Sequence, residues 1–171
     1  MENNNDYTID KINHLINIAE DGKEGYENAA EDVKDSEFKS AFLIFAQERS
    51  NYATQLRQIV HQLGGDSEGT GGGSAGSLHR VWMDLKSVFT SGDSEAIINA
   101  CTTGEEAAIK EYKMILADDQ ISESFKPLIG DQLNGIEQAL ASIKLHVHSS
   151  GFISEMHAVF WFQKLKFQSL I

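Results

Sequence analysis

Proline is almost absent from this chain, and its absence is the feature that most limits what the chain can fold into. One proline occurs in 171 residues, far below the usual share of about 5%. Seven of the 14 glycines fall between residues 64 and 76. Because proline and glycine are the residues that disfavour helix most strongly, the rest of the chain is free to form long helices.

Four long segments repeat apolar residues at three- and four-residue steps, the pattern of a helix with one buried face. We expect helices over about residues 8–33, 36–63, 93–117 and 122–147. Thr8 is the expected N-cap of the first helix, and Pro127 suits the first turn of the fourth. No segment alternates in the manner of a strand, so the sequence predicts an all-α fold.

The lengths of the connections predict the topology. Only Asp35 and Ser36 separate the first two helices, whereas 29 residues, 64–92, separate the second from the third. This connection begins as a glycine- and serine-rich loop and continues into residues 78–89, whose apolar side chains share one face of a short helix. A helix of 28 residues is about 42 Å long, a length that the connection can span. We therefore expect residues 1–148 to form a ferritin-like four-helix bundle with a long crossover that contains a short helix.

Several stretches resemble a bacterial family of ferritin-like four-helix bundles that is known as a domain of unknown function. They are residues 21–32 (DGKEGYENAAED), 45–49 (FAQER), 76–86 (GSLHRVWMDLK) and 104–108 (GEEAA). The resemblance runs from about residue 8 to 145. It implies the ferritin-like fold and suggests a stress-related role, but it implies no activity. Members of the family carry a histidine in the last helix where this chain has Leu140, which weakens a metal site inferred by resemblance.

The charge and the cysteine content exclude several classes of protein. The formal net charge is −12, from 14 basic and 26 acidic side chains, so nucleic acid and anionic membranes would repel the chain. One cysteine excludes an internal disulfide. No signal peptide and no apolar run of about 18 residues is visible, and we expect a cytoplasmic protein.

The carboxylates and histidines do not follow the pattern of a di-metal centre. Ferritin-like oxidases and iron stores use a Glu from each of two helices and a Glu-x-x-His pair from each of the others, and this chain contains no Glu-x-x-His. Helical geometry predicts that His14 and His61 face outward and that Glu20, Glu24, Glu27 and Glu31 form an outward acidic stripe. We expect no catalytic residue, no cofactor and no metal. The alternative is an iron or manganese site with the unusual ligand set Glu27, Glu48, Glu105 and Glu137.

A small set of polar side chains is expected inside the bundle. Arg49 falls within the apolar face of the second helix, with Glu48 at its edge, and Glu105 points inward from the third helix. A buried guanidinium is costly unless it is paired, so we expect Arg49 to contact Glu105 or Glu48, with Tyr26 or Tyr52 nearby. The other possibility is that Arg49 extends along the edge of the core. Gly22 also faces inward, either because two helices approach closely there or because a small cavity is kept open.

The last 23 residues, 149–171, differ from the acidic bundle. They are rich in phenylalanine and carry Lys164 and Lys166. This tail could pack on the bundle, form a dimer contact, lie on a membrane or be the product of a shifted reading frame. We favour packing or self-association over membrane contact.

Two hypotheses for function remain. The favoured one is a non-catalytic helical bundle that acts through self-association, as a homo-oligomer such as a dimer, or through a protein partner. The alternative is a metal-binding oxidase or iron store with the carboxylate set named above. Enzymatic activity stays open, with a non-catalytic role preferred.

Overall fold

The computed structural model describes residues 2–66 and 93–149, and these residues form four helices and no strand. The helices are α1 (Glu2–Asp32), α2 (Ser36–Gln62), α4 (Ser94–Leu116) and α5 (Lys126–Ser149). The all-α prediction is confirmed for this part of the chain. The expected crossover helix lies outside the described residues, as does the C-terminal tail beyond Ser149. None of the described helices is both long enough and apolar enough to cross a membrane.

Local sequence signals account for the ends of α2 and α4. The Asp35 carboxylate accepts hydrogen bonds from the backbone N–H groups of Glu37 and Phe38 at 2.8 and 3.1 Å, and Asp93 caps α4 in the same way. At the end of α2, Gly64 adopts a φ of +79°, a left-handed conformation that glycine reaches without a steric penalty. The N–H of Gly65 then donates to the carbonyl of Val60 at 3.0 Å, which closes the helix in the Schellman manner.

Two predicted helix starts differ from the observed ones. Thr8 is not an N-cap, because α1 already begins at Glu2 and Thr8 is buried within it. Residues 2–7 contain no helix breaker, and their acidic side chains favour a helix N-terminus, so the helix extends further than the apolar pattern. The fourth helix begins at Lys126 rather than at residues 122–124, since a turn from Ser122 to Phe125 precedes it. Pro127 lies in its first turn, as predicted.

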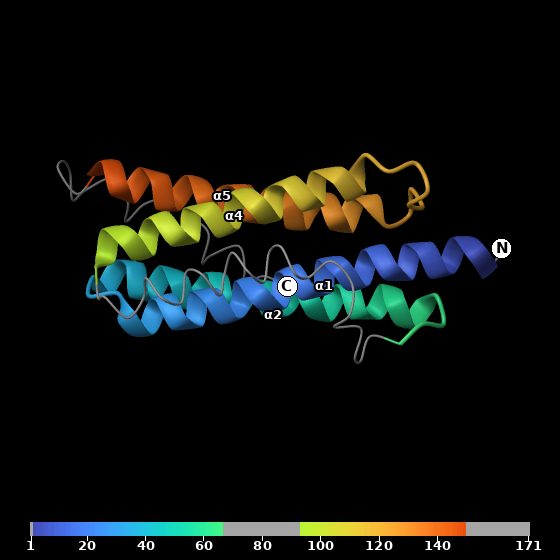
Figure 1. The fold of residues 1–171 in the computed structure, drawn as a ribbon, viewed down its shortest axis with the longest axis horizontal. Helices are drawn as coiled ribbons and strands as arrows, with labels where there is room; N and C mark the ends of the chain where they lie inside the picture. The colour runs from blue at the N-terminus through green and yellow to red at the C-terminus, as the bar shows by residue number, and fades with distance from the viewer. Residues whose placement is uncertain (1, 67–92, 150–171) are drawn as a thin grey trace, which may run out of the picture.

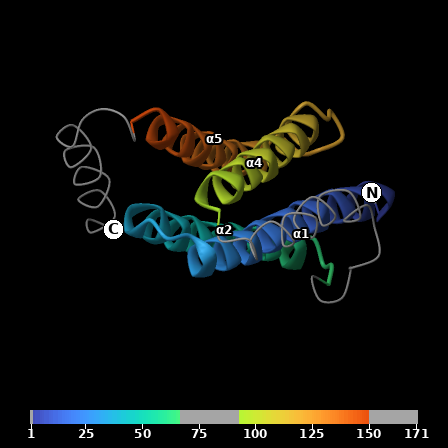
Figure 2. The same ribbon diagram turned by 60° about the vertical axis from the view of Figure 1, so that its left-hand side comes forward.

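The four helices pack as two antiparallel pairs in two layers. α1 packs along α2, α4 packs along α5, and α1 also contacts α4. Figure 1 shows that α2 and α4 run in the same direction, while α1 and α5 run in the opposite one. The end of α2 and the start of α4 therefore lie at opposite ends of the molecule. Figure 2 shows the α1–α2 pair as one layer and the α4–α5 pair as the other.

The core consists of two apolar clusters, one toward each end of the bundle. Members of one cluster include Ile12, Leu15, Leu56, Val60, Tyr112, Ile115, Ile129 and Ile136. Members of the other include Tyr26, Phe38, Phe42, Phe45, Ile97, Cys101 and Ile143. On α2 and α4 the change from one cluster to the other falls near the middle of the helix, where Arg49 and Glu105 lie, and on α1 it falls beyond the middle, where Gly22 lies. The boundary between the clusters therefore contains two charged side chains.

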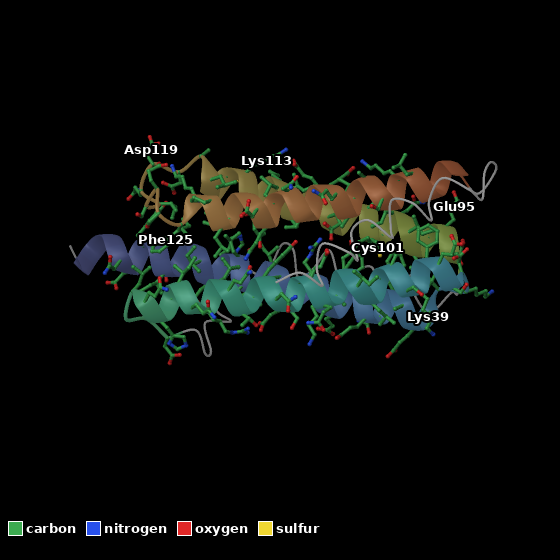
Figure 3. The ribbon with its side chains drawn as sticks, turned by 180° about the vertical axis from the view of Figure 1, so that it is seen from behind. Lys39, Glu95, Cys101, Lys113, Asp119 and Phe125 are labelled. Carbon is green, nitrogen blue, oxygen red and sulfur yellow. The ribbon has the colours of Figure 1, made fainter. Side chains whose placement is uncertain are left out.

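The labelled side chains in Figure 3 mark the two ends and the interior of the bundle. Asp119 and Phe125 lie at one end, and Lys39 and Glu95 at the other. Cys101 points from α4 into the space between the layers and is fully buried. At this location it behaves as a small buried apolar side chain.

α2 and α5 approach closely at Gly135. A Cβ atom at this position would collide with the hydroxyl oxygen of Tyr52 and lie 3.1 Å from its Cζ atom. Gly130, one and a half turns earlier on α5, has no atom within 4 Å of its corresponding Cβ position. The two glycines thus have opposite surroundings on the same helix.

We expect Gly135→Ala to lower the free energy of unfolding by about 1–3 kcal/mol, because the added methyl group overpacks the contact with Tyr52. Gly130→Ala should raise it by up to about 1 kcal/mol, because alanine has the higher helix propensity. Urea unfolding followed by circular dichroism measures both changes. Tyr52→Phe in the Gly135→Ala background should recover part of the loss. Equal losses in the two glycine variants would contradict this packing.

Candidate functional site

The most unusual feature of the interior is a charged pair buried between the two apolar clusters. Arg49 of α2 is 2% exposed and Glu105 of α4 is 1% exposed. Arg49 shares the buried face of α2 with Phe45 and Ala53, four residues before and after it. Glu105 follows Cys101 by four residues on the buried face of α4. The helical repeat therefore places both charges inside the bundle.

Glu105 accepts hydrogen bonds from two helices. Nη2 of Arg49 lies 2.7 Å from Oε1 and 2.8 Å from Oε2 of Glu105. The hydroxyl of Tyr26, on α1, donates to Oε1 at 2.7 Å. Charge-assisted hydrogen bonds of this length are among the stronger ones in proteins. One carboxylate thus connects α1, α2 and α4 at the middle of the bundle.

Two tyrosine rings flank the guanidinium. The Cζ atom of Arg49 lies 5.8 Å from the ring centroid of Tyr26 and 5.3 Å from that of Tyr52, within the range of cation–π attraction. The position of Gly22 faces the aliphatic part of the same side chain, since a Cβ atom there would lie 3.5 Å from Cδ of Arg49. Gly22 therefore adjoins Arg49 at ordinary van der Waals distance.

The sequence predicted a contact of Arg49 with Glu105 or Glu48 and a nearby tyrosine, Tyr26 or Tyr52. The structure brings Arg49, Glu105 and both tyrosines together. Nη2 of Arg49 donates to both carboxylate oxygens of Glu105, whereas its Nη1 atom is buried without a hydrogen-bond partner within the described residues. Glu48 is half-buried beside this centre.

The electrostatic environment keeps Arg49 charged and keeps the Tyr26 hydroxyl and the Cys101 thiol protonated. Burial by itself lowers the pKa of Arg49, but the carboxylate of Glu105 more than offsets it, and the net pKa is raised. Burial first, and the charge of Glu105 second, raise the pKa of Tyr26. Burial also raises the pKa of the Cys101 thiol. A neutral thiol is a poor nucleophile, so the centre holds a cation, a tyrosine hydroxyl and a thiol with no activated group.

A second polar contact inside the bundle was not predicted. The side chain of Gln132 on α5 is 1% exposed. It accepts a hydrogen bond from the hydroxyl of Tyr112 at 3.0 Å and donates one to Gln55 at 2.9 Å. Its position between Ile129 and Ile136, at helical spacing, was the available signal for burial.

The four carboxylates of the alternative metal site do not converge. Glu27 is exposed, and its Oε1 atom lies 3.6 Å from Nζ of Lys23 on the same helix. Oε1 of Glu137 lies 2.7 Å from Nζ of Lys113. Glu48 is half-buried, and Glu105 contacts Arg49. In residues 2–66 and 93–149, no group of three or more histidine, cysteine or carboxylate side chains is placed to hold a metal ion.

The remaining sequence expectations for titratable residues have mixed outcomes. The four glutamates of the acidic stripe are all exposed, as is His61. The prediction that His14 faces outward is wrong. Its ring is half-buried, and Nε2 lies 2.9 Å from Oε2 of Glu111 on α4. The periodicity of α1 alone could not show that α4 covers this flank. His79 and His157 and the side chains of His146 and His148 lie outside the described part.

A comparison with known protein families assigns the chain to one of them. The family model of the domain of unknown function DUF2383 matches residues 7–118. The chain belongs to the DUF2383 family. The matched range contains Tyr26, Arg49 and Glu105 and ends before α5, earlier than the resemblance to about residue 145 predicted. No curated protein matches the chain.

The buried pair of this DUF2383 member can be tested by substitution. Arg49→Ala should lower the free energy of unfolding by about 3–5 kcal/mol, because it leaves the carboxylate of Glu105 buried without its partner. Arg49→Met should be less damaging in a Glu105→Gln background than in the wild type. A double-mutant cycle measured by urea unfolding gives the coupling energy of the two side chains. Additive losses would show that the pair is not coupled.

Proposed function

We propose that this DUF2383 member is a non-catalytic helical bundle of ferritin-like fold that acts through association, either with further copies of itself or with a protein partner. The buried Arg49–Glu105 pair is the observation that carries the non-catalytic part of this proposal, and the apolar residues 149–171 support the association. The other support comes from the directions of the helices.

The order of helix directions supports the ferritin-like assignment. α2 and α4 are consecutive among the described helices and run in the same direction, so a long connection must return the chain to the other end of the bundle. Four-helix bundles with one such long connection are typical of ferritin-like proteins. Residues 67–92 supply the required length.

The chemistry of the bundle centre supports a non-catalytic role. In metal-dependent ferritin-like proteins, inward carboxylates and histidines neutralise two cations at the centre of the bundle. Here the inward carboxylate of Glu105 is neutralised by a guanidinium, whose positive charge does not dissociate at physiological pH. The hydrogen bond from Tyr26 further occupies Oε1. An internal cation thus supplies the charge that a metal would otherwise supply.

Metal analysis of the purified protein distinguishes this proposal from an iron or manganese site. We expect fewer than about one tightly bound iron or manganese ion per chain after aerobic purification, because the six-ligand pattern of a di-metal centre is not met. Glu105→Gln should leave this content unchanged. Two ions per chain that are lost in Glu48→Ala and Glu105→Ala would overturn the proposal in favour of the metal site.

Association can be tested with the apolar tail, which lies outside the described residues. Residues 149–171 hold many large apolar side chains, and burial of half of such a segment is worth several kcal/mol at about 25 cal/mol per Å². We expect a chain that ends at residue 148 to remain helical and to form smaller assemblies than the full chain. Light scattering and circular dichroism measure mass and fold. Identical masses would exclude association through the tail, and an unfolded truncated chain would show that the tail belongs to the core.

A further inference from the structure

A groove lies between the first half of α1 and the C-terminal part of α4, away from the buried Arg49–Glu105 pair. Its volume is about 480 Å³, within the range of small-molecule sites. Tyr7, Asp10, Lys11 and His14 line it from α1, and Glu111, Met114 and Asp118 line it from α4 and its C-terminal end. The groove is therefore amphipathic, with carboxylates beside apolar side chains.

One side chain in this groove lacks hydrogen-bond partners. Asn13 is 3% exposed and lines the groove. Neither its Oδ1 atom nor its Nδ2 atom has a hydrogen-bond partner within the described residues. Leaving a buried amide in this state is unfavourable, because its lost hydrogen bonds to water are not replaced. A ligand or water that donates to Oδ1 from the groove would remove that cost.

The charges of the groove favour a cation. Three carboxylates, from Asp10, Glu111 and Asp118, line the groove together with one ammonium group, that of Lys11, and the imidazole of His14. Nε2 of His14 lies 2.9 Å from Oε2 of Glu111, so the carboxylates outnumber the basic side chains by one. Oδ2 of Asp118 accepts a hydrogen bond from the hydroxyl of Tyr7 at 2.5 Å, which lowers the pKa of this carboxyl and keeps it ionised at neutral pH. The Lys11 ammonium lies 5.2 Å from the ring centroid of Tyr7. The surplus of negative charge in a partly enclosed groove attracts positively charged small molecules.

The arrangement of the carboxylates favours an elongated cation over a compact one. Glu111 lies within α4, whereas Asp118 follows the C-cap Ala117 of that helix, seven positions later in the sequence. Met114 lies between them in sequence, 58% exposed, and can contact a methylene chain. A metal ion does not fit, because no group of three or more metal-ligating side chains forms in the described part of the chain.

We infer that the groove between α1 and α4 binds an aliphatic polyamine, with ammonium groups at the carboxylates and at Oδ1 of Asn13 and with methylene groups against Met114. This assignment is independent of the proposed function, because it involves neither the buried pair nor the tail.

Calorimetric titration of the full chain with spermidine tests the inference. We expect saturable binding of one spermidine per chain, and Asp118→Asn should weaken it at least about tenfold, because a close opposite charge is removed. The matched control is Glu31→Gln, which removes one carboxylate from an exposed position of α1 and should change the affinity less than about twofold. Equal weakening by both variants would overturn the inference, since it would reduce the binding to diffuse attraction by an acidic protein. Absence of saturable binding would overturn it as well.

Two further measurements keep the test decisive. Should Asp118→Asn fail to fold by circular dichroism, Glu111→Gln takes its place with the same expected loss of affinity. In ¹H–¹⁵N correlation NMR spectra, the side-chain amide signals of Asn13 are identified by their disappearance in Asn13→Ala. These signals should shift as spermidine is added. They should not shift when magnesium chloride is added at the same concentration of positive charge. Spermidine binding without movement of this amide pair would place the bound cation elsewhere and overturn the inference.

Discussion

The buried ion pair between Arg49 and Glu105 is the interaction on which the rest of the bundle depends. Removing two charges from water costs several kcal/mol for each ion, and their mutual attraction offsets this only with good geometry and additional hydrogen bonds. Here the carboxylate accepts three hydrogen bonds, two from Arg49 and one from Tyr26, and two tyrosine rings flank the guanidinium. The side chains around the pair must therefore be positioned to complete these hydrogen bonds and ring contacts.

This requirement constrains how the helices can be placed relative to each other. A shift of α4 by one residue would turn Glu105 away from Arg49 and leave a buried charge without its partner. The apolar clusters on either side, rich in alanine, isoleucine and phenylalanine, would tolerate such a shift better, because apolar contacts are not directional. The polar centre thus selects one register of α2 against α4.

The sequence predicted many of the features that depend on one helix at a time, but not the starts of α1 and α5. The bounds of α2 and α4 were predicted to within one residue, and the burial of Arg49 follows from its place on the apolar face of α2. The caps at Asp35 and Asp93 were not predicted. Among the features that depend on a neighbouring helix, the contact of Arg49 with Glu105 was predicted as one of two alternatives, and two others were missed. His14 becomes half-buried because α4 covers its flank, and Gln132 finds partners on α2 and α4. Periodicity describes the face of a helix, but it does not describe what covers that face.

The division of the bundle into two helical hairpins has a consequence for how the hairpins recognise each other. The α1–α2 hairpin contributes the guanidinium of Arg49 to its apolar face, and the α4–α5 hairpin contributes the carboxylate of Glu105. Two α1–α2 hairpins brought face to face would bury two guanidinium groups, and two α4–α5 hairpins would bury two carboxylates. Both like-with-like pairings carry a repulsive charge contact that the native pairing replaces by attraction. The single ion pair therefore favours the pairing of the α1–α2 hairpin with the α4–α5 hairpin over the pairing of two identical hairpins.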